Sequence, residues 1–159
     1  MKKAVLRVAA FAAAMALPAT SAQAQCWSEE AVTAAKIRDM ETMLMVASLR
    51  CRRQSNRMLA DYNHFVRQSR AALVRVNEEL RLHFAPTGGL NAYDSYVTAI
   101  ANRYGAGAEG LTCEDMASIL SAANAEGGSF HGLARLASDA GVEPVLDGRR
   151  CPMTIATVR

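Results

Sequence analysis

The chain has 159 residues, of which 51% are apolar and 6% aromatic, with 18 basic and 15 acidic side chains. This length is sufficient for one domain that buries its own core. The few aromatic residues favour a core of Ala, Leu, Met and Val, a composition that suits helices better than a sheet.

The first 24 residues have the three parts of a secretory signal peptide: basic Lys2, Lys3 and Arg7, an apolar run over 8–17, and the small-x-small sequence Ala22-Gln23-Ala24. We expect cleavage after Ala24 and a single helical domain over 25–159. The apolar run is too short to span a membrane and no second run follows, which predicts an exported, periplasmic protein without a transmembrane segment.

The charge of the mature chain follows from this cleavage. The leader contains three of the basic residues and no acidic residue, so 25–159 has 15 of each sign. A formally neutral domain gives no global reason to expect nucleic acid as a partner.

A long amphipathic helix is predicted over Ser28 to Arg53. Its apolar side chains recur at steps of three and four residues, at Ile37, Met40, Leu44, Ala47 and Cys51. Ser28 is a suitable N-cap. A second helix is expected from about Arg57 to Phe84, with Leu59, Tyr62, Val66, Leu73, Val76 and Leu80 inward and only Ser69 interrupting the pattern.

Three shorter helices complete the prediction. The first carries Leu90, Tyr93, Val97, Ile100 and Tyr104 and stops at Gly105. The next opens at a capping box of Thr112 and Asp115 and runs to about Glu126. Ser129 caps the last, whose inward residues are Phe130, Leu133, Leu136 and Ala140.

Short connections between long helices favour antiparallel neighbours. Pro144, Gly148 and Pro152 exclude a long element near the end of the chain. The expected fold is therefore all-α: a disulfide-stapled up-down bundle of about five helices with an irregular C-terminal tail.

Four cysteines in an exported chain predict two disulfides, with three possible pairings. Cys26 and Cys51 flank the first helix, which at about 1.5 Å per residue separates them by on the order of 35 Å. A disulfide needs Cα atoms within about 7 Å, so this pairing is excluded. In an up-down bundle Cys51 and Cys113 lie at the same end, which leaves Cys151 for Cys26. We expect Cys51–Cys113 and Cys26–Cys151.

The segment from Gly105 to Gly110 matches the G-x-G-x-x-G dinucleotide pattern by letter. That motif requires a strand before it and a helix opening at its third glycine, whereas here a predicted helix ends and a loop follows. Gly128-Ser129-Phe130-His131-Gly132 likewise brings a serine near a histidine without the G-x-S-x-G pattern. We expect no cofactor and assign no catalytic residue.

Histidine–carboxylate pairs at Asp61 and His64 and at Glu79 and His83 lack the Glu-x-x-His pattern of a di-metal bundle, so we expect solvated ion pairs and no metal. Four arginines gather at the end of the first long helix, with Arg103 expected nearby. They are a candidate patch for an anionic ligand or an acidic partner, although a solvated helix end explains them as well. The patch consists of Arg50, Arg52, Arg53 and Arg57.

Several short stretches carry a resemblance to a known family. They are Cys26-Trp27-Ser28, 35–39, 43–46, Arg50-Cys51, 62–63, 65–66, 92–94 and 101–105. In these the chain resembles small exported bacterial four-cysteine proteins. The resemblance implies export and the four-cysteine pattern. Relatives are sometimes labelled S-adenosylhomocysteine hydrolase, but the enzyme of that name is a much larger NAD-dependent Rossmann protein, so no catalytic residue carries over.

The leading hypothesis is an exported helical protein that binds a small ligand, an envelope component or a partner protein. The alternatives are a small secreted hydrolase with an unrecognised site and an envelope-stress chaperone. An open apolar groove would favour binding, whereas a fully packed bundle would leave a structural role.

Overall fold

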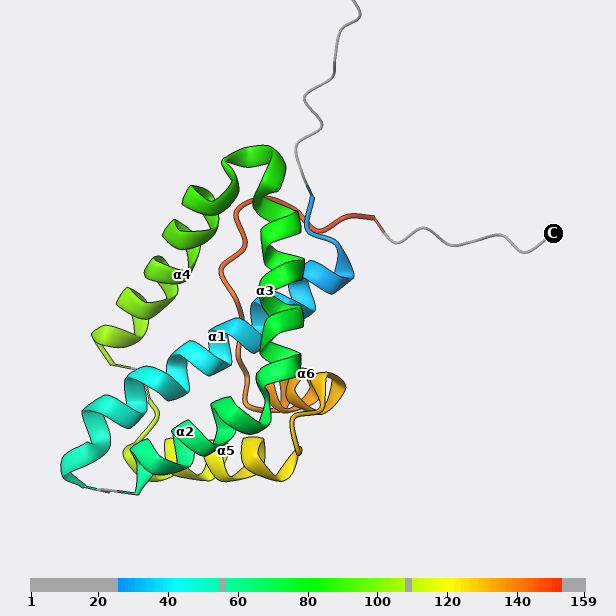
Figure 1. Cartoon of the computed structure of the whole chain (residues 1–159). Coiled ribbons are helices and arrows are strands. Elements are labelled where there is room, and N and C mark those ends of the chain that lie inside the picture. Colours follow the sequence, from blue (N-terminus) through cyan, green and yellow to red (C-terminus); the bar gives the residue numbers. More distant parts are fainter. Residues whose placement is uncertain (1–25, 55–56, 108–109, 153–159) are drawn as a thin grey trace, which may run out of the picture.

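A computed structural model describes residues 26–54, 57–107 and 110–152. The fold is all-α, as predicted (Figure 1). It also has two disulfides, as predicted. Within the described ranges the helices are α1 Glu29–Arg50, α2 Met58–Gln68, α3 Arg70–Phe84, α4 Gly89–Gly105, α5 Cys113–Ala125 and α6 Phe130–Asp139, with short 3₁₀ turns η1 Cys51–Arg53 and η2 Ala85–Thr87. The predicted leader lies outside the described residues.

The N-terminal caps expected from the sequence are present. The Ser28 hydroxyl accepts from the Ala31 N–H at 3.1 Å, and the Ser129 hydroxyl accepts from the Gly132 N–H at 3.1 Å. Thr112 and Asp115 form the predicted capping box. Each cap satisfies backbone donors that have no partner inside the helix.

The predicted helix over 57–84 is two helices, because the α-helical backbone ends at Gln68 and starts again at Arg70. Ser69 lies between them with φ −90° and ψ 9°. The last turn of α5 packs against this break: the Gln68 side-chain amide donates to the Asn124 carbonyl at 2.9 Å. The break lets α2 pack on α5 while α3 packs on α1.

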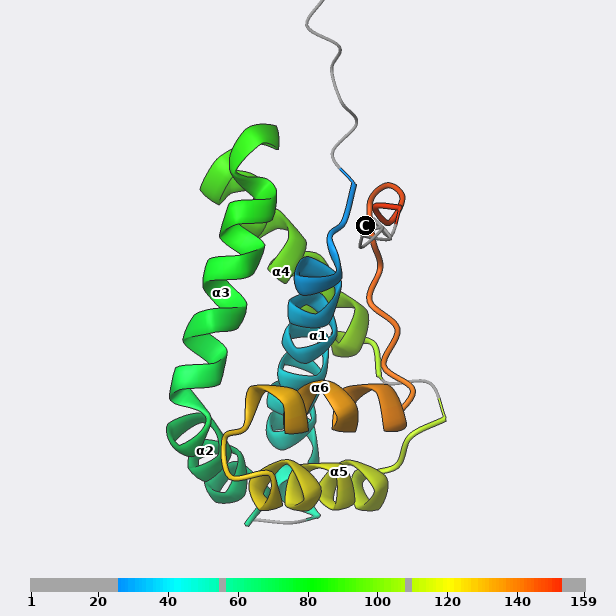
Figure 2. The ribbon, with the colours of Figure 1, turned by 90° about the vertical axis from the view of Figure 1, so that its right-hand side faces the viewer.

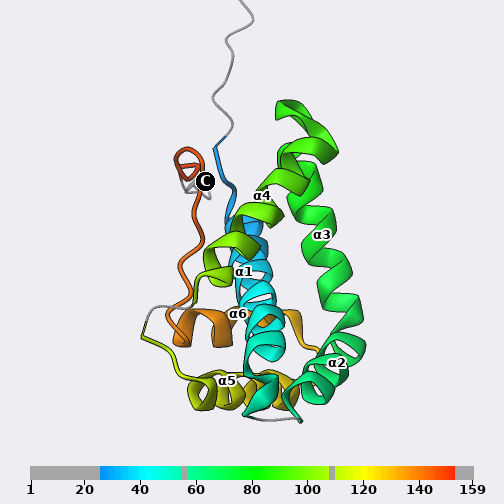
Figure 3. The same cartoon turned by 90° about the vertical axis from the view of Figure 1, so that its left-hand side faces the viewer.

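Helix α1 is the centre of the molecule and contacts each of the helices α2 to α6. Figures 2 and 3 show it in the middle, with α3 and α4 along its length and α5 and α6 crossing it. The chain direction reverses from α1 to α2–α3 and again at α4, as expected for an up-down arrangement (Figure 1).

The predicted apolar stripe of α1 is buried, and so are side chains on its other faces. These include the carboxylates of Asp39 and Glu41, which an amphipathic pattern places at or beyond the edge of the core. By contrast, Leu59 and Leu90, both expected to face inward, are exposed; Leu90 is 59% exposed. Between Ala31 and Ser48 no residue of α1 is exposed, because five other helices pack around it, so polar residues of this part are covered as well.

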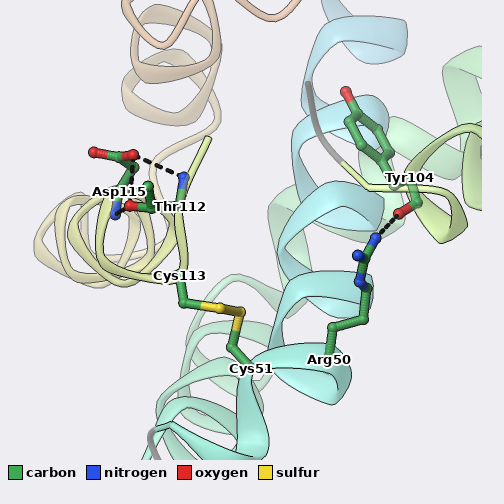
Figure 4. Close-up of a disulfide and its surroundings, with 6 residues drawn as sticks. All are labelled: Arg50, Cys51, Tyr104, Thr112, Cys113 and Asp115. Atoms are coloured by element: carbon green, nitrogen blue, oxygen red, sulfur yellow. Dashed lines mark hydrogen bonds between the residues drawn. A yellow bond between two sulfur atoms is a disulfide. The ribbon is translucent and has the colours of Figure 1, made fainter. Parts of the chain in front are cut away.

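Both predicted disulfides are formed. Cys51 and Cys113 have a Cα separation of 5.7 Å and join the end of α1 to the start of α5 (Figure 4). Cys26 and Cys151, with Cα atoms 4.8 Å apart, join the two ends of the described chain.

Residues 142–152, called here the tail, contain no helix and are fixed through Trp27. The Trp27 N–H donates to the Arg149 carbonyl at 2.9 Å, and the Cys151 N–H donates to the Trp27 carbonyl at 2.8 Å. The indole N–H also donates to the Asp147 carbonyl at 3.1 Å. Trp27 is only 1% exposed, so the tail is anchored in the core at its far end.

No helix in the described residues is both long and apolar enough to cross a membrane.

Candidate ligand-binding cavity

A cavity of about 670 Å³ opens where the end of α3, the length of α4 and the tail meet. Its wall is mostly apolar, from Phe84, Ala92, Ala99, Ile100 and Val145. Polar side chains interrupt this wall at a few points. They are His83, Thr87, Ser95, Tyr96, Arg103 and Asp147.

An aromatic cluster supports one side of the cavity. The indole of Trp27 stacks on the imidazole of His83 with ring centroids 3.7 Å apart, and it meets Phe84 edge-on at 5.7 Å. Tyr96 lies 5.2 Å from Phe84 by ring centroid. Burial lowers the pKa of His83 from its usual value of 6.5, because the charged imidazolium would lose hydration there.

The guanidinium of Arg103 is held by two neighbours at another part of the cavity wall. Its Nη2 donates to Oδ2 of Asp39 and lies 3.1 Å from the hydroxyl oxygen of Tyr104, while the Tyr104 hydroxyl donates to Oδ1 of Asp39 at 2.5 Å. Asp39 is fully buried, whereas the Arg103 side chain is 35% exposed. Arg103 therefore reaches the cavity from a fixed position with its charge paired.

The pKa values of this group follow from its surroundings. Burial works against the charge of Arg103, but the hydrogen bond to Asp39 and the charge of that carboxylate outweigh burial and raise the pKa of Arg103. Burial, followed by the hydrogen bond to Asp39, raises the pKa of Tyr104. Arg103 thus stays charged and Tyr104 stays a neutral donor at any physiological pH.

Tyr96 contributes a second phenol to the cavity wall. Its hydroxyl is buried and has no hydrogen-bond partner among the described residues. Burial raises the pKa of Tyr96, and the nearby charge of Asp39 adds to the effect. The hydroxyl is therefore a protonated donor with unused capacity, which is uncommon for a buried polar group.

A separate polar network crosses α1 away from the cavity. Arg38 donates to Glu41 at 2.6 Å and also to Asn77. The Tyr62 hydroxyl donates to Glu41 at 2.5 Å, and the Tyr93 hydroxyl donates to Asn77 at 2.6 Å. Burial, with the charge of Glu41, raises the pKa of Tyr62. These bonds join α1 to α2, α3 and α4. Because its members bond to one another, the network serves packing.

The four arginines of the predicted anion patch do not have equivalent surroundings. Arg50 donates to the carbonyls of Tyr104 and Gly105 at 3.2 and 3.3 Å, so it caps the end of α4 (Figure 4). Arg52, Arg53 and Arg57 are exposed. An anionic ligand at these residues stays a prediction. Arg103, expected beside them, instead pairs with Asp39.

The loop after α4 requires a glycine for a reason unrelated to the dinucleotide motif. Gly107 has φ +119°, and a Cβ there would lie 3.2 Å from Nη1 of Arg50. A helix precedes the loop, as expected, whereas the dinucleotide motif requires a strand. Residues 108–109 of the pattern lie outside the described residues.

A second cavity, smaller than the first, lies near this loop. It has a volume of about 260 Å³ beside Cys51 and Cys113 and is lined in part by Arg50. Among the described residues no group of three or more metal-ligating side chains is assembled.

The sequence did not indicate this cavity, although it brought His83 and Arg103 into other candidate sites. Arg103 and Asp39 are 64 positions apart, and tail residues contribute only because Trp27 binds them. The one available signal was a charged residue, Asp39, within an apolar helix pattern.

Comparison with protein-family models, with curated proteins and with solved structures found no match. The class that the described residues define is a disulfide-stapled all-α protein with an open, mostly apolar cavity, and its function is inferred from that geometry.

Proposed function

We propose that this is an exported binding protein and that its ligand is a small, largely apolar molecule held in the cavity between α3, α4 and the tail. The cavity itself carries the proposal. Ligand sites typically have volumes of about 300–1,000 Å³, apolar and aromatic walls and a few fixed polar groups. This cavity has the volume, the wall and the polar groups Arg103 and Tyr96.

The arrangement suits binding because its polar groups are fixed before a ligand arrives. Asp39 and Tyr104 hold Arg103, and Phe84 packs against Tyr96. A preorganised wall reduces the conformational entropy that binding would otherwise cost. The Trp27 ring, stacked on the cavity residue His83, places a spectroscopic reporter beside the site.

Fluorescence titration with the uncharged apolar dye phenylnaphthylamine tests the proposal. The dye should bind saturably to the wild type, and Ala99→Phe, which places a ring in the cavity, should weaken binding at least about tenfold. Ala60→Phe is the matched control, because Ala60 is an exposed alanine on α2 outside the cavity. Equal dye affinity in wild type and Ala99→Phe would refute this location.

Export is the second part of the proposal. It rests on the leader sequence over 1–24 and on two disulfides, which persist in oxidising compartments such as the periplasm. Amino-terminal sequencing of the protein from its native host should begin at Gln25. A protein beginning at Met1 in a reducing compartment would contradict export.

A further inference from the structure

We infer that the ligand of this cavity is an uncharged amphipathic molecule with an acceptor oxygen at its head, such as an amide or a carbonyl compound, and that the site discriminates against the carboxylate of the same shape. This inference rests on the proposed binding function and specifies the ligand class.

The charges at the cavity give the first reason. Arg103 is the one cation of the cavity wall at pH 8, because the lowered pKa of His83 leaves that ring neutral there. Its positive charge is paired with buried Asp39. Asp147 adds a carboxylate from the tail at the cavity rim. The sum over Asp39, Arg103 and Asp147 is −1, so a ligand carboxylate would be repelled rather than attracted overall.

Arginine is in general a good partner for a carboxylate, which it binds through two parallel hydrogen bonds. Here Asp39 already holds Nη2 of Arg103 and is itself fixed by the Tyr104 hydroxyl. A ligand carboxylate would compete with a buried, hydrogen-bonded one. The charge of Arg103 is therefore already paired within the protein, although through one hydrogen bond to Asp39 and not two.

The hydrogen-bonding capacity of the wall gives the second reason. A guanidinium carries five N–H donors, and only Nη2 of Arg103 bonds to a described residue. The Tyr96 hydroxyl also lacks a partner among those residues but is buried, so the donors available to a ligand are those of Arg103. Donors that remain after internal pairing favour an acceptor oxygen, and a carbonyl supplies it without adding charge.

The apolar wall determines the body of the ligand. Phe84, Ile100 and Val145 line the cavity beside small Ala92 and Ala99, which leave room for a chain or a ring. Removing such a body from water contributes the larger part of the binding free energy, while the head selects among molecules with equal bodies.

Competition between decanamide and decanoate tests the inference, since the two differ in charge and hardly in shape. Each compound is titrated against protein with bound phenylnaphthylamine, at about pH 8, where decanoate is ionised. Both compounds are kept below the concentration at which they form micelles. Decanamide should bind at least about tenfold more tightly. Asp147→Asn should narrow this ratio severalfold, whereas Asp139→Asn, at the exposed end of α6, should leave it unchanged.

The outcomes separate the inference from the proposed function. If decanoate binds as tightly as decanamide or more tightly, the uncharged ligand class is wrong while the cavity remains a binding site. If neither molecule displaces the dye and Ala99→Phe leaves dye binding intact, the binding function itself is refuted.

Discussion

The single tryptophan of the chain stacks on His83, with an angle of 27° between the ring planes. This contact joins residue 27, just before α1, to the last turn of α3, and the tail then bonds to the same tryptophan. Core packing, the cavity wall and a titratable ring therefore meet at one side chain whose fluorescence can be recorded.

Stability should decrease as the pH falls below about 6.5. Because burial lowers the pKa of His83 in the folded protein, the unfolded chain binds more protons in the window between the lowered value and 6.5. The stabilising effect of the neutral ring is complete above pH 6.5 and is lost as pH falls through that window. Urea unfolding monitored by Trp27 emission at about pH 8 and about pH 5.5 measures the difference.

His83→Phe keeps an aromatic ring against Trp27 but removes the titration, so this pH dependence should shrink. His64→Gln, an exposed histidine on α2, serves as the control and should retain it. An unchanged pH dependence in His83→Phe would show that another group is responsible. The hydrogen bonds from Thr112 lower the pKa of Asp115, so its effect belongs below pH 3.8, in a separate range.

The two disulfides should differ in what their removal exposes. Cys51→Ser with Cys113→Ser removes a bridge across 62 residues, and we expect a loss of about 3–5 kcal/mol and a clearly lower melting temperature. Circular dichroism should show the helix content retained at low temperature. A melting temperature equal to that of the wild type would contradict this expectation.

Cys26→Ser with Cys151→Ser should mainly loosen the tail. Trp27 emission should shift to the red, because the tail backbone covers the indole, and dye affinity should fall, because Val145 and Asp147 belong to the cavity wall. The Cys51–Cys113 double variant is the matched control, since its bridge lies away from this cavity. Equal dye affinity in both double variants would contradict a role for the tail.

The Asp39–Arg103 pair should contribute more to the free energy of unfolding than a surface ion pair does. Arg103→Met would leave a fully buried carboxylate without its cation, at a cost of about 2–3 kcal/mol. The expected cost is below the range for a fully buried pair, because a third of the Arg103 side chain is exposed. Combining Arg103→Met with Asp39→Asn should cost less than the sum of the single changes, and additive costs would exclude coupling.

Gly128 should tolerate no side chain. It has φ +79°, and a Cβ there would lie 2.5 Å from the Gln68 carbonyl oxygen at the break between α2 and α3. Gly141 has a similar φ of +67° with no atom within 4 Å of such a Cβ. Gly141→Ala should cost about 1–2 kcal/mol for the backbone conformation alone. Gly128→Ala should lower the free energy of unfolding by more than this, because of the added contact with the Gln68 carbonyl oxygen. Urea unfolding of both variants measures the difference, and equal losses would contradict an effect of this contact.

Much of this fold could be predicted because its determinants are local or covalent. Ser28, Thr112 and Ser129 indicate helix starts by side-chain chemistry that acts within three residues. The length of one helix excluded one disulfide pairing, and the expected up-down topology selected between the other two. Ser69 interrupts the apolar spacing, but one such residue did not predict that the helix ends there, and the break packs against the end of α5, more than fifty residues later.

The cavity depends on contacts that no periodic pattern encodes. Asp39 and Arg103 are polar residues in two different helices, and only packing α4 against α1 makes them partners. Tyr96 belongs to the inward face of α4 by spacing, yet the spacing does not show that its buried hydroxyl lacks a partner among the described residues. Such features arise from how the helices fit together, which the spacing of side chains does not specify.

The bond from the Trp27 indole to Asp147 also orders events in time. The two residues are 120 positions apart. At a translation rate of about 5–20 residues per second, a ribosome adds Asp147 about 6–24 s after Trp27. Before the tail is made, helices that are already complete can associate, but the indole lacks its last covering and the cavity lacks one wall. Residues 142–152 thus complete the proposed site, so a chain that ends before residue 142 should form helices but should not bind the dye.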